Sequence, residues 1–179
     1  PPASNANYAW ILHILNKLNV SRGIAGFLLA NGALDDSDTL EIRKLLIESD
    51  KVEAIIVLPR NMFYSTDISV TLWILNNNKK GGPWHGRQLR NRTGEILFID
   101  LRTWNSNIYE KKYVRLTEAD IDRVRQIYFN WQTENFVEYA EPELYYAAHR
   151  DEIQGKGYSL VPSRYIEFID RDTEIDYQS

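Results

Sequence analysis

The chain has 179 residues, of which 44% are hydrophobic and 26% are charged, and these proportions are typical of a soluble globular protein. Its length suits one domain with an appended element, or two small domains. It contains no cysteine, which excludes disulfides and thiolate metal sites, and no apolar run is long enough to cross a membrane. We therefore expect a cytoplasmic protein.

Charge is distributed unevenly along the chain. Residues 1–133 carry 17 Lys and Arg against 14 Asp and Glu, whereas residues 134–179 carry 4 against 11. The acidic tail is not expected to approach phosphates, because like charges repel; a simple solvated surface is the alternative interpretation. The chain begins with Pro1 and has no initiator Met or signal-peptide pattern, which indicates a piece of a longer protein.

The first half of the chain alternates helical and extended patterns. Apolar residues at helical spacing predict a helix over 7–18, and an almost wholly apolar run predicts a buried strand over 24–30. Asp38, with Glu41 three residues later, predicts the capped start of a second helix. A second apolar strand is expected over 52–58. This alternation is typical of an α/β fold with helices packed on the faces of a sheet.

A third strand over 68–75 and a fourth over 95–101 follow. About nine residues join 52–58 to 68–75, too few for a crossover helix, so these two strands should be antiparallel and the sheet mixed. Thr117 is expected to cap a helix over 117–134. Residues 142–154 are also expected to be helical, and an aromatic segment over 158–168 closes the chain.

Seven segments of the chain carry a resemblance to a known family, in order and at similar spacing over almost the whole chain. They are residues 1–10, 25–32, 52–59, 62–66, 72–76, 96–100 and 158–165. Together they resemble the modification subunits of type I restriction–modification systems, which are DNA adenine-N6 methyltransferases. The fold class that follows from the resemblance is a partial Rossmann-like methyltransferase sheet, made of its carboxyl-terminal strands, with a helical appendage.

The resemblance implies that the full-length subunit transfers a methyl group from S-adenosylmethionine to N6 of adenine. Two family features have no counterpart here: the Gly-rich cofactor loop and the catalytic Asn-Pro-Pro-Phe motif. Pro1 and Pro2 do not supply that motif, because Ala3 follows where the aromatic residue should stand. We therefore expect no catalytic residue in this chain, no binding of the cofactor by it, and no methylation by it alone.

The chain is nevertheless expected to contribute to the pocket for a flipped base, since an adenine inside a duplex must leave the stack to react. Open α/β sheets bind ligands at the carboxyl ends of their strands. The residues at that edge that we expect to contact the base and the DNA are Phe63, Tyr64 and Thr66, after the 52–58 strand, and Asn31, after the 24–30 strand. The alternative is that Phe63 and Tyr64 only fill a turn.

A basic segment between the third and fourth strands is a second candidate for phosphate contact. It has five cations and no acid over 76–94, a composition found in phosphate-binding loops. These cations are Lys79, Lys80, Arg87, Arg90 and Arg92. Because the third strand is expected to run antiparallel to the second, this loop should lie at the sheet edge opposite the residues expected to contact the base. A solvated loop is therefore the alternative. The three histidines are far apart in the sequence and predict no metal site.

The resemblance also suggests two domains, with residues 1–114 as the carboxyl-terminal half of the catalytic domain and 115–179 as a helical tail that docks a partner. The implied partners are the specificity subunit, a second modification subunit, a restriction subunit in the full complex, and double-stranded DNA. The tyrosines expected to anchor the docking are Tyr139, Tyr145, Tyr146 and Tyr158. A tail that merely packs on its own domain, an interaction module without catalytic contacts, and a free-standing α/β binding domain remain alternatives.

Overall fold

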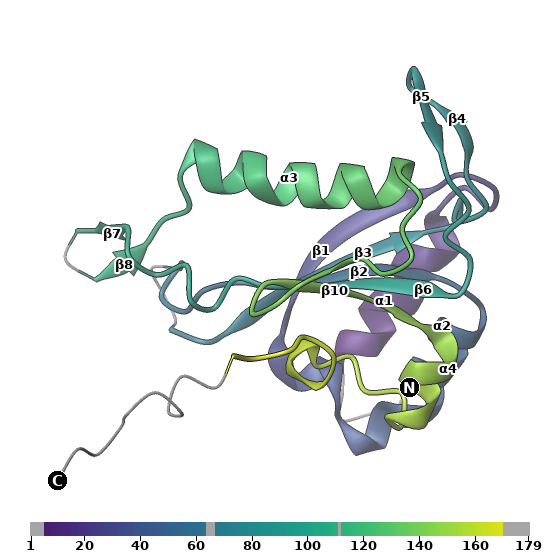
Figure 1. The fold of residues 1–179 in the computed structure, drawn as a ribbon. Helices are drawn as coiled ribbons and strands as arrows, with labels where there is room; N and C mark the ends of the chain where they lie inside the picture. Colours follow the sequence, from purple (N-terminus) through teal and green to yellow (C-terminus); the bar gives the residue numbers. More distant parts are fainter. Residues whose placement is uncertain (1–5, 64–66, 111, 170–179) are drawn as a thin grey trace, which may run out of the picture.

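The fold is a mixed α/β sandwich in which a six-stranded sheet carries helices on both faces (Figure 1). A computed structural model describes residues 6–63, 67–110 and 112–169. The strands of this sheet are β1 (Ile24–Ala30), β2 (Val52–Val57), β3 (Val70–Asn76), β6 (Glu95–Asp100), β9 (Ala140–Glu141) and β10 (Tyr145–His149). The helix-and-sheet architecture predicted from the sequence is confirmed.

The strand order is β1-β3-β2-β6-β10-β9. β3 runs antiparallel to both of its neighbours, β1 and β2, as the short connection before it predicted. β2 pairs with β6 in parallel, and β10 is antiparallel to β6. Consequently β1, β2 and β6 all point the same way and end at one edge of the sheet, which we call the carboxyl edge.

In the described part of the chain, four α-helices flank the sheet: α1 (Ala6–Lys17), α2 (Leu40–Glu48), α3 (Glu118–Thr133) and α4 (Arg150–Gly155). α3 lies along one face, and the other three lie on the opposite face (Figure 1). Single-turn helices occur at Asn31–Leu34, Ser37–Thr39 and Pro162–Arg164. No helix in the described part of the chain is long and apolar enough to span a membrane.

Side chains that alternate along the strands build two cores, one on each face. Trp73 and Phe98 point to the face of α1, α2 and α4, whereas Ile56 and Leu97 point to α3, where they meet Ile127 and Trp131. All of these side chains are buried. Burial on both faces explains why β2 is an almost unbroken apolar run.

β1 differs from the prediction that it is buried, because its residues alternate between exposed and half-buried. It is the last strand of the sheet on its side, and α3 covers the middle of the sheet rather than this end (Figure 1). Ile24 and Leu28 are 46% and 45% exposed as a result. An apolar strand without a neighbour on its outer edge is open to pairing.

The start of α2 also differs from the prediction. The side chain of Asp36 accepts a hydrogen bond from the backbone N–H of Asp38, 2.9 Å away, so it caps a short helical turn before α2. Thr39, at the cap of α2 itself, makes no side-chain cap bond. The predicted capping role of Asp38 is therefore wrong, whereas the predicted cap of α3 by Thr117 is confirmed as a full capping box with Asp120.

The largest correction concerns residues 142–154, which were expected to form a helix. Residues 145–149 form β10, whose pairing with β6 extends the main sheet, and only Arg150–Gly155 are helical. Alternation of Tyr145 and Ala147 on one face with Tyr146 and Ala148 on the other fits a strand.

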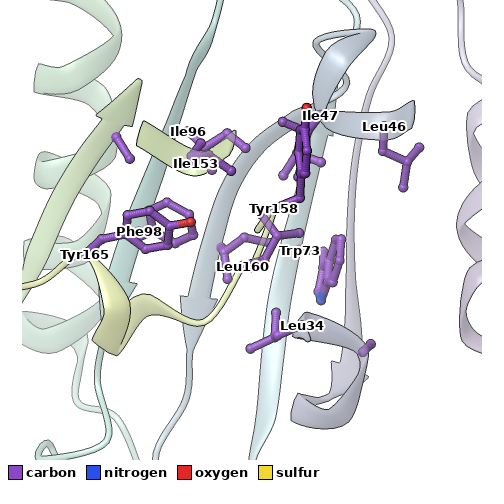
Figure 2. Packing of buried hydrophobic residues seen from close by; sticks show 14 of the residues in the cluster. Leu34, Leu46, Ile47, Trp73, Ile96, Phe98, Ile153, Tyr158, Leu160 and Tyr165 are labelled. Atoms are coloured by element: carbon purple, nitrogen blue, oxygen red, sulfur yellow. The ribbon is translucent and has the colours of Figure 1, made fainter. Parts of the chain in front are cut away.

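The segment that follows α4 belongs to the main core rather than to a separate tail. Tyr165 stacks on Phe98 with ring centroids 4.2 Å apart, and Leu160 is fully buried in the cluster that contains Trp73 (Figure 2). The backbone N–H of Leu160 donates to the carbonyl of Leu34. The domain boundary expected after residue 114 thus divides neither the sheet nor the cores, because residues on both sides of it contribute to each.

Two β-hairpins project from opposite ends of the molecule (Figure 1). One is formed by β4 (Gly82–Trp84) and β5 (Arg87–Leu89); its turn, His85-Gly86, has positive φ at both positions, as a tight two-residue hairpin turn requires. The other is formed by β7 (Ile108–Tyr109) and β8 (Tyr113–Val114). It projects next to the start of α3.

Candidate functional site

Three chain segments meet at the carboxyl edge, one after each of the strands that end there. Asn31 follows β1, Phe63 lies in the loop after β2, and Asp100 is the last residue of β6. The backbone N–H of Leu101 donates to the carbonyl of Val57 and links the ends of β6 and β2. The expectation that Asn31 and the Phe63 loop share an edge, given parallel strands, is confirmed by the strand directions.

Asn31 is half-buried and already has a partner within the chain. Its side-chain oxygen accepts a hydrogen bond of 2.6 Å from the hydroxyl of Thr71 on β3, and its backbone N–H donates to the carbonyl of Ser69. These contacts fix the backbone where β1 ends. Asn31 is therefore held in place at the end of β1, and its amide nitrogen is the side-chain group that these contacts leave for a ligand.

Phe63 is half-buried at the carboxyl edge. Two residues before it, the carbonyl of Asn61 accepts a hydrogen bond of 2.9 Å from the backbone N–H of Val114 in β8. The loop is therefore tied to the β7–β8 hairpin. Tyr64 and Thr66, the other two residues expected to contact the base, lie outside the described residues.

The edge also carries an ion pair that the sequence reasoning missed. Both carboxylate oxygens of Asp100 accept hydrogen bonds from the guanidinium of Arg102, at 2.6 to 3.0 Å. Asp100 is 3% exposed, and its hydrogen bonds with Arg102 raise the pKa of that guanidinium. An Asp at the end of an apolar strand, with an Arg two residues later, was the available signal.

The basic segment 76–94 emerges at the opposite edge, as predicted, but it is mostly not a phosphate-binding loop. Lys79 is buried, and its ammonium group donates to the carbonyls of Val52 and Glu95 and pairs with Asp50. Burial lowers the pKa of Lys79, an effect that the charge of Asp50 opposes. An ammonium group with these partners, on a side chain only 2% exposed, is not available to a phosphate.

Arg92 is the second buried cation of this segment and is fully enclosed. Its guanidinium meets the equally buried carboxylate of Glu53 at 3.2 Å, which also accepts from Gln132 and Tyr128 of α3. Burial first, and then the charge of Glu53, raise the pKa of Tyr128 well above its usual value. The Arg92–Glu53 ion pair and its hydrogen bonds therefore connect the loop, β2 and α3. Because Arg92 is fully buried, it cannot contact a phosphate.

The remaining cations of the segment are nearer the surface. Arg90 forms a two-pronged ion pair with Glu95 at 2.6 and 2.8 Å, and the guanidinium of Arg87 lies 4.1 Å from the ring centre of Phe129. Lys80 is exposed. Arg87 is half-buried and one of its guanidinium nitrogens is fully buried, so of the five cations Lys80 is the one most open to a ligand.

The tyrosines expected to anchor a partner fall into two groups. Tyr139 and Tyr158 are each 8% exposed, and their hydroxyls donate to the carbonyl of Ile127 and to the carboxylate of Glu48. They pack inside the protein, so their predicted role as contact residues does not fit. Tyr145 and Tyr146 are half-buried and border a surface hollow.

That hollow is acidic. Besides Tyr145, Tyr146 and Tyr165 it is lined by Glu138, Ala140, Glu141, Pro142, Glu152 and Glu167. Burial, followed by the charge of Glu152, raises the pKa of Tyr146, so its hydroxyl stays protonated near neutral pH. Glu141 and Glu152 are already paired with Arg123 and Lys156, so the acidic excess of the hollow comes from Glu138 and Glu167, and it suits a basic ligand better than a phosphate.

The match to known proteins covers nearly the whole chain. Residues 1–174 match the model of a family described as N-6 DNA methylase. The chain belongs to this family. It is 34% identical over 169 residues to the methylase subunit of the type I restriction enzyme HindI from Haemophilus influenzae, covering 93% of this chain and 35% of that protein. A second relative, the MjaIX methylase subunit from Methanocaldococcus jannaschii, is 33% identical over 99% of this chain and 30% of its own length.

A solved structure agrees with the sequence relatives. The methyltransferase subunit of a type I restriction–modification system from Streptococcus thermophilus superposes with a TM-score of 0.74 at 26% identity, over 93% of this chain and 31% of that one. The chain thus spans about a third of the length of the proteins it matches. Family and fold agree with the resemblance identified from the sequence.

Proposed function

We propose that this chain forms the carboxyl-terminal part of the catalytic domain of a DNA adenine-N6 methyltransferase, the modification subunit of a type I restriction–modification system in the cytoplasm. The observation that carries the proposal is the carboxyl edge, where β1, β2 and β6 end together within a member of the N-6 DNA methylase family. Ligands of open α/β sheets bind at such an edge. In this proposal, the chain contributes residues that line the pocket of the target base.

The chemistry at this edge follows from what a flipped adenine needs. The base must leave the duplex and gain stacking and hydrogen bonds that replace those it loses. Phe63 is a half-buried aromatic side chain at this edge and suits stacking. Asn31, fixed by Thr71, keeps an amide nitrogen as donor, and Tyr64 and Thr66 complete the proposed loop.

S-adenosylmethionine supplies the methyl group in this chemistry, and the described residues of this edge do not fit it. Its amino and hydroxyl groups need acceptors, but the two oxygens of Asp100, at the end of β6, already accept four hydrogen bonds from Arg102, three from its guanidinium and one from its backbone N–H. The matched relatives are about three times as long, and we assign the cofactor site to their other segments. Calorimetry on the 179-residue chain should give no heat of binding; a micromolar affinity would contradict this assignment.

The base-facing role is tested by Phe63→Ala in the complete modification subunit with its specificity subunit. Methylation of N6 in target DNA should fall by about 10-fold to 100-fold, in line with the roughly 1–3 kcal/mol that one base–aromatic stack provides. Phe136→Ala, which removes a 40% exposed ring from the loop after α3, is the matched control and should leave the rate unchanged. Equal rates for the two variants would refute the role of Phe63.

The acidic hollow beside Tyr145 and Tyr146 supports a second role, docking of a protein partner. The glutamates there, of which Glu141 and Glu152 are paired with Arg123 and Lys156, leave an acidic excess that favours a basic protein surface over DNA. The proposed partner is the specificity subunit, within a complex that also holds a second modification subunit and a restriction subunit. Tyr146→Ala combined with Glu141→Lys should reduce co-purification of the specificity subunit. Undiminished co-purification at high and low salt would contradict this docking site.

A further inference from the structure

The β7–β8 hairpin is a basic and aromatic arm on the carboxyl edge. Residues 100–115 contain four basic residues against two acidic ones, in contrast to the acidic tail. The basic residues are Arg102, Lys111, Lys112 and Arg115, and the acidic ones are Asp100 and Glu110. Since Arg102 is paired with Asp100, the excess positive charge comes from residues 110–115 of the sequence.

The two tyrosines of the hairpin face the same way. Tyr109 lies directly opposite Tyr113 in the pairing of β7 with β8, so both rings share one face. Tyr109 is 44% exposed. The ammonium of Lys112 lies 5.5 Å from the centre of the Tyr113 ring, and the guanidinium of Arg115 lies 5.9 Å from that of Tyr109. Tyr113 is half-buried, so the hairpin presents one exposed ring with cations beside it, a composition found on surfaces that bind nucleic-acid strands.

The arm is held in place at its base. The backbone N–H of Arg115 donates to the carbonyl of Asn107, and the Asn107 side chain donates back to the carbonyl of Arg115. The bond from Val114 to the carbonyl of Asn61 then ties the hairpin to the loop that carries Phe63. The position of the cations relative to the base-facing loop is therefore set by the fold.

We infer that this hairpin contacts the phosphate backbone of the DNA strand that flanks the flipped base, through Lys112 and Arg115. The inference rests on the proposed function, because a base enters at the carboxyl edge only if its own strand runs along that edge. The hairpin projects from the same edge, next to the start of α3 (Figure 1). Contacts to phosphate position the strand without reading its sequence.

The test is the double substitution Lys112→Ala and Arg115→Ala in the complete modification subunit bound to its specificity subunit. Binding of a fluorescein-labelled DNA duplex is followed by anisotropy over a series of salt concentrations, for a target sequence and for a scrambled one. Two lost phosphate contacts should weaken binding of both duplexes alike and reduce the slope of log K against log salt by about 2. Circular dichroism confirms that the variant is folded.

Lys17→Ala with Arg22→Ala is the matched control. It also removes one Lys and one Arg, both exposed, but at the opposite edge, before β1 begins. This control should keep the wild-type slope. A slope unchanged by the hairpin variant, with wild-type complex that binds the duplex normally, would overturn the inference and leave the proposed function standing.

Two other outcomes are distinguishable. If the hairpin variant loses the specificity subunit in gel filtration but the wild type retains it, the hairpin contacts a protein, and the inference of DNA contact is wrong. If the wild-type complex binds no duplex and methylates none, the proposed function fails and the inference fails with it. Retained assembly together with the reduced salt slope is the result that we expect.

Discussion

The enclosed ion pair between Arg92 and Glu53 gives the sharpest prediction about stability. Both side chains are 0% exposed. In the variant Arg92→Leu, three hydrogen bonds of the guanidinium disappear, to Glu53 and to the carbonyls of Arg90 and Asn78. The carboxylate stays buried with Gln132 and Tyr128 as the donors that remain to its first oxygen, and its second oxygen has no partner among the described residues.

Breaking a buried ion pair by removal of one partner costs about 3–5 kcal/mol, so we expect the free energy of unfolding of Arg92→Leu to fall by that amount. Urea denaturation of the 179-residue chain, followed by circular dichroism, measures it. Combining Arg92→Leu with Glu53→Leu should cost less than the sum of the single variants, with a coupling of about 2 kcal/mol. A loss of about 1 kcal/mol or less, as for exposed pairs, would refute this reasoning.

Three further predictions concern acid stability, the tail and the sheet edge. Burial alone would raise the pKa of Glu95, but the hydrogen bonds and charge of Arg90 lower it below 4.5. The stability that Glu95 contributes is therefore present above pH 4.5 and is lost as the pH falls through the lowered pKa. Glu95→Gln should reduce this loss of stability in urea denaturation at a series of acid pH values, and an unchanged pH dependence would contradict the assignment. Deleting residues 135–179 removes β10 and the buried Tyr165 and Leu160, so circular dichroism should show an unfolded chain, and a cooperative melt would disprove this. Because β1 is an edge strand without a charged residue, light scattering should show self-association of the chain that Leu28→Lys abolishes; a monomer before substitution would count against it.

The sequence predicted the elements whose signals are local. Periodicity placed α1, α3 and the strands β1, β2, β3 and β6 within a few residues of their observed bounds, and the short link before β3 correctly predicted its antiparallel direction. The capping box of Thr117 with Asp120 depends only on neighbours in the chain. Such features need no knowledge of the packing partners.

Features that depend on distant partners were missed or misplaced. Residues 145–149 carry a pattern compatible with helix or strand, and their pairing with β6, about fifty residues earlier, decides for a strand. Lys79 and Arg92 looked like surface cations because nothing in the sequence shows Asp50 and Glu53 folding against them. A basic loop and a buried ion-pair cluster have the same composition.

The candidate site also has features that the sequence predicted and features that depend on distant contacts. The edge that carries Asn31 and Phe63 followed from strand direction, whereas the Asp100–Arg102 pair and the β7–β8 hairpin did not. The run Lys111-Lys112-Tyr113, with Arg115 after it, was visible in the sequence, but its place beside the Phe63 loop depends on the bond between Val114 and Asn61.

The most direct test of the account is whether the carboxyl edge receives a flipped base. A duplex with 2-aminopurine in place of the target adenine fluoresces more strongly when that base leaves the stack. On binding by the complete complex, we predict a rise in fluorescence, and a rise of different size for Phe63→Ala at saturating protein, because the ring both holds the flipped base and quenches its emission by stacking on it. An equal rise for wild type and variant would contradict the placement of the target base at this edge.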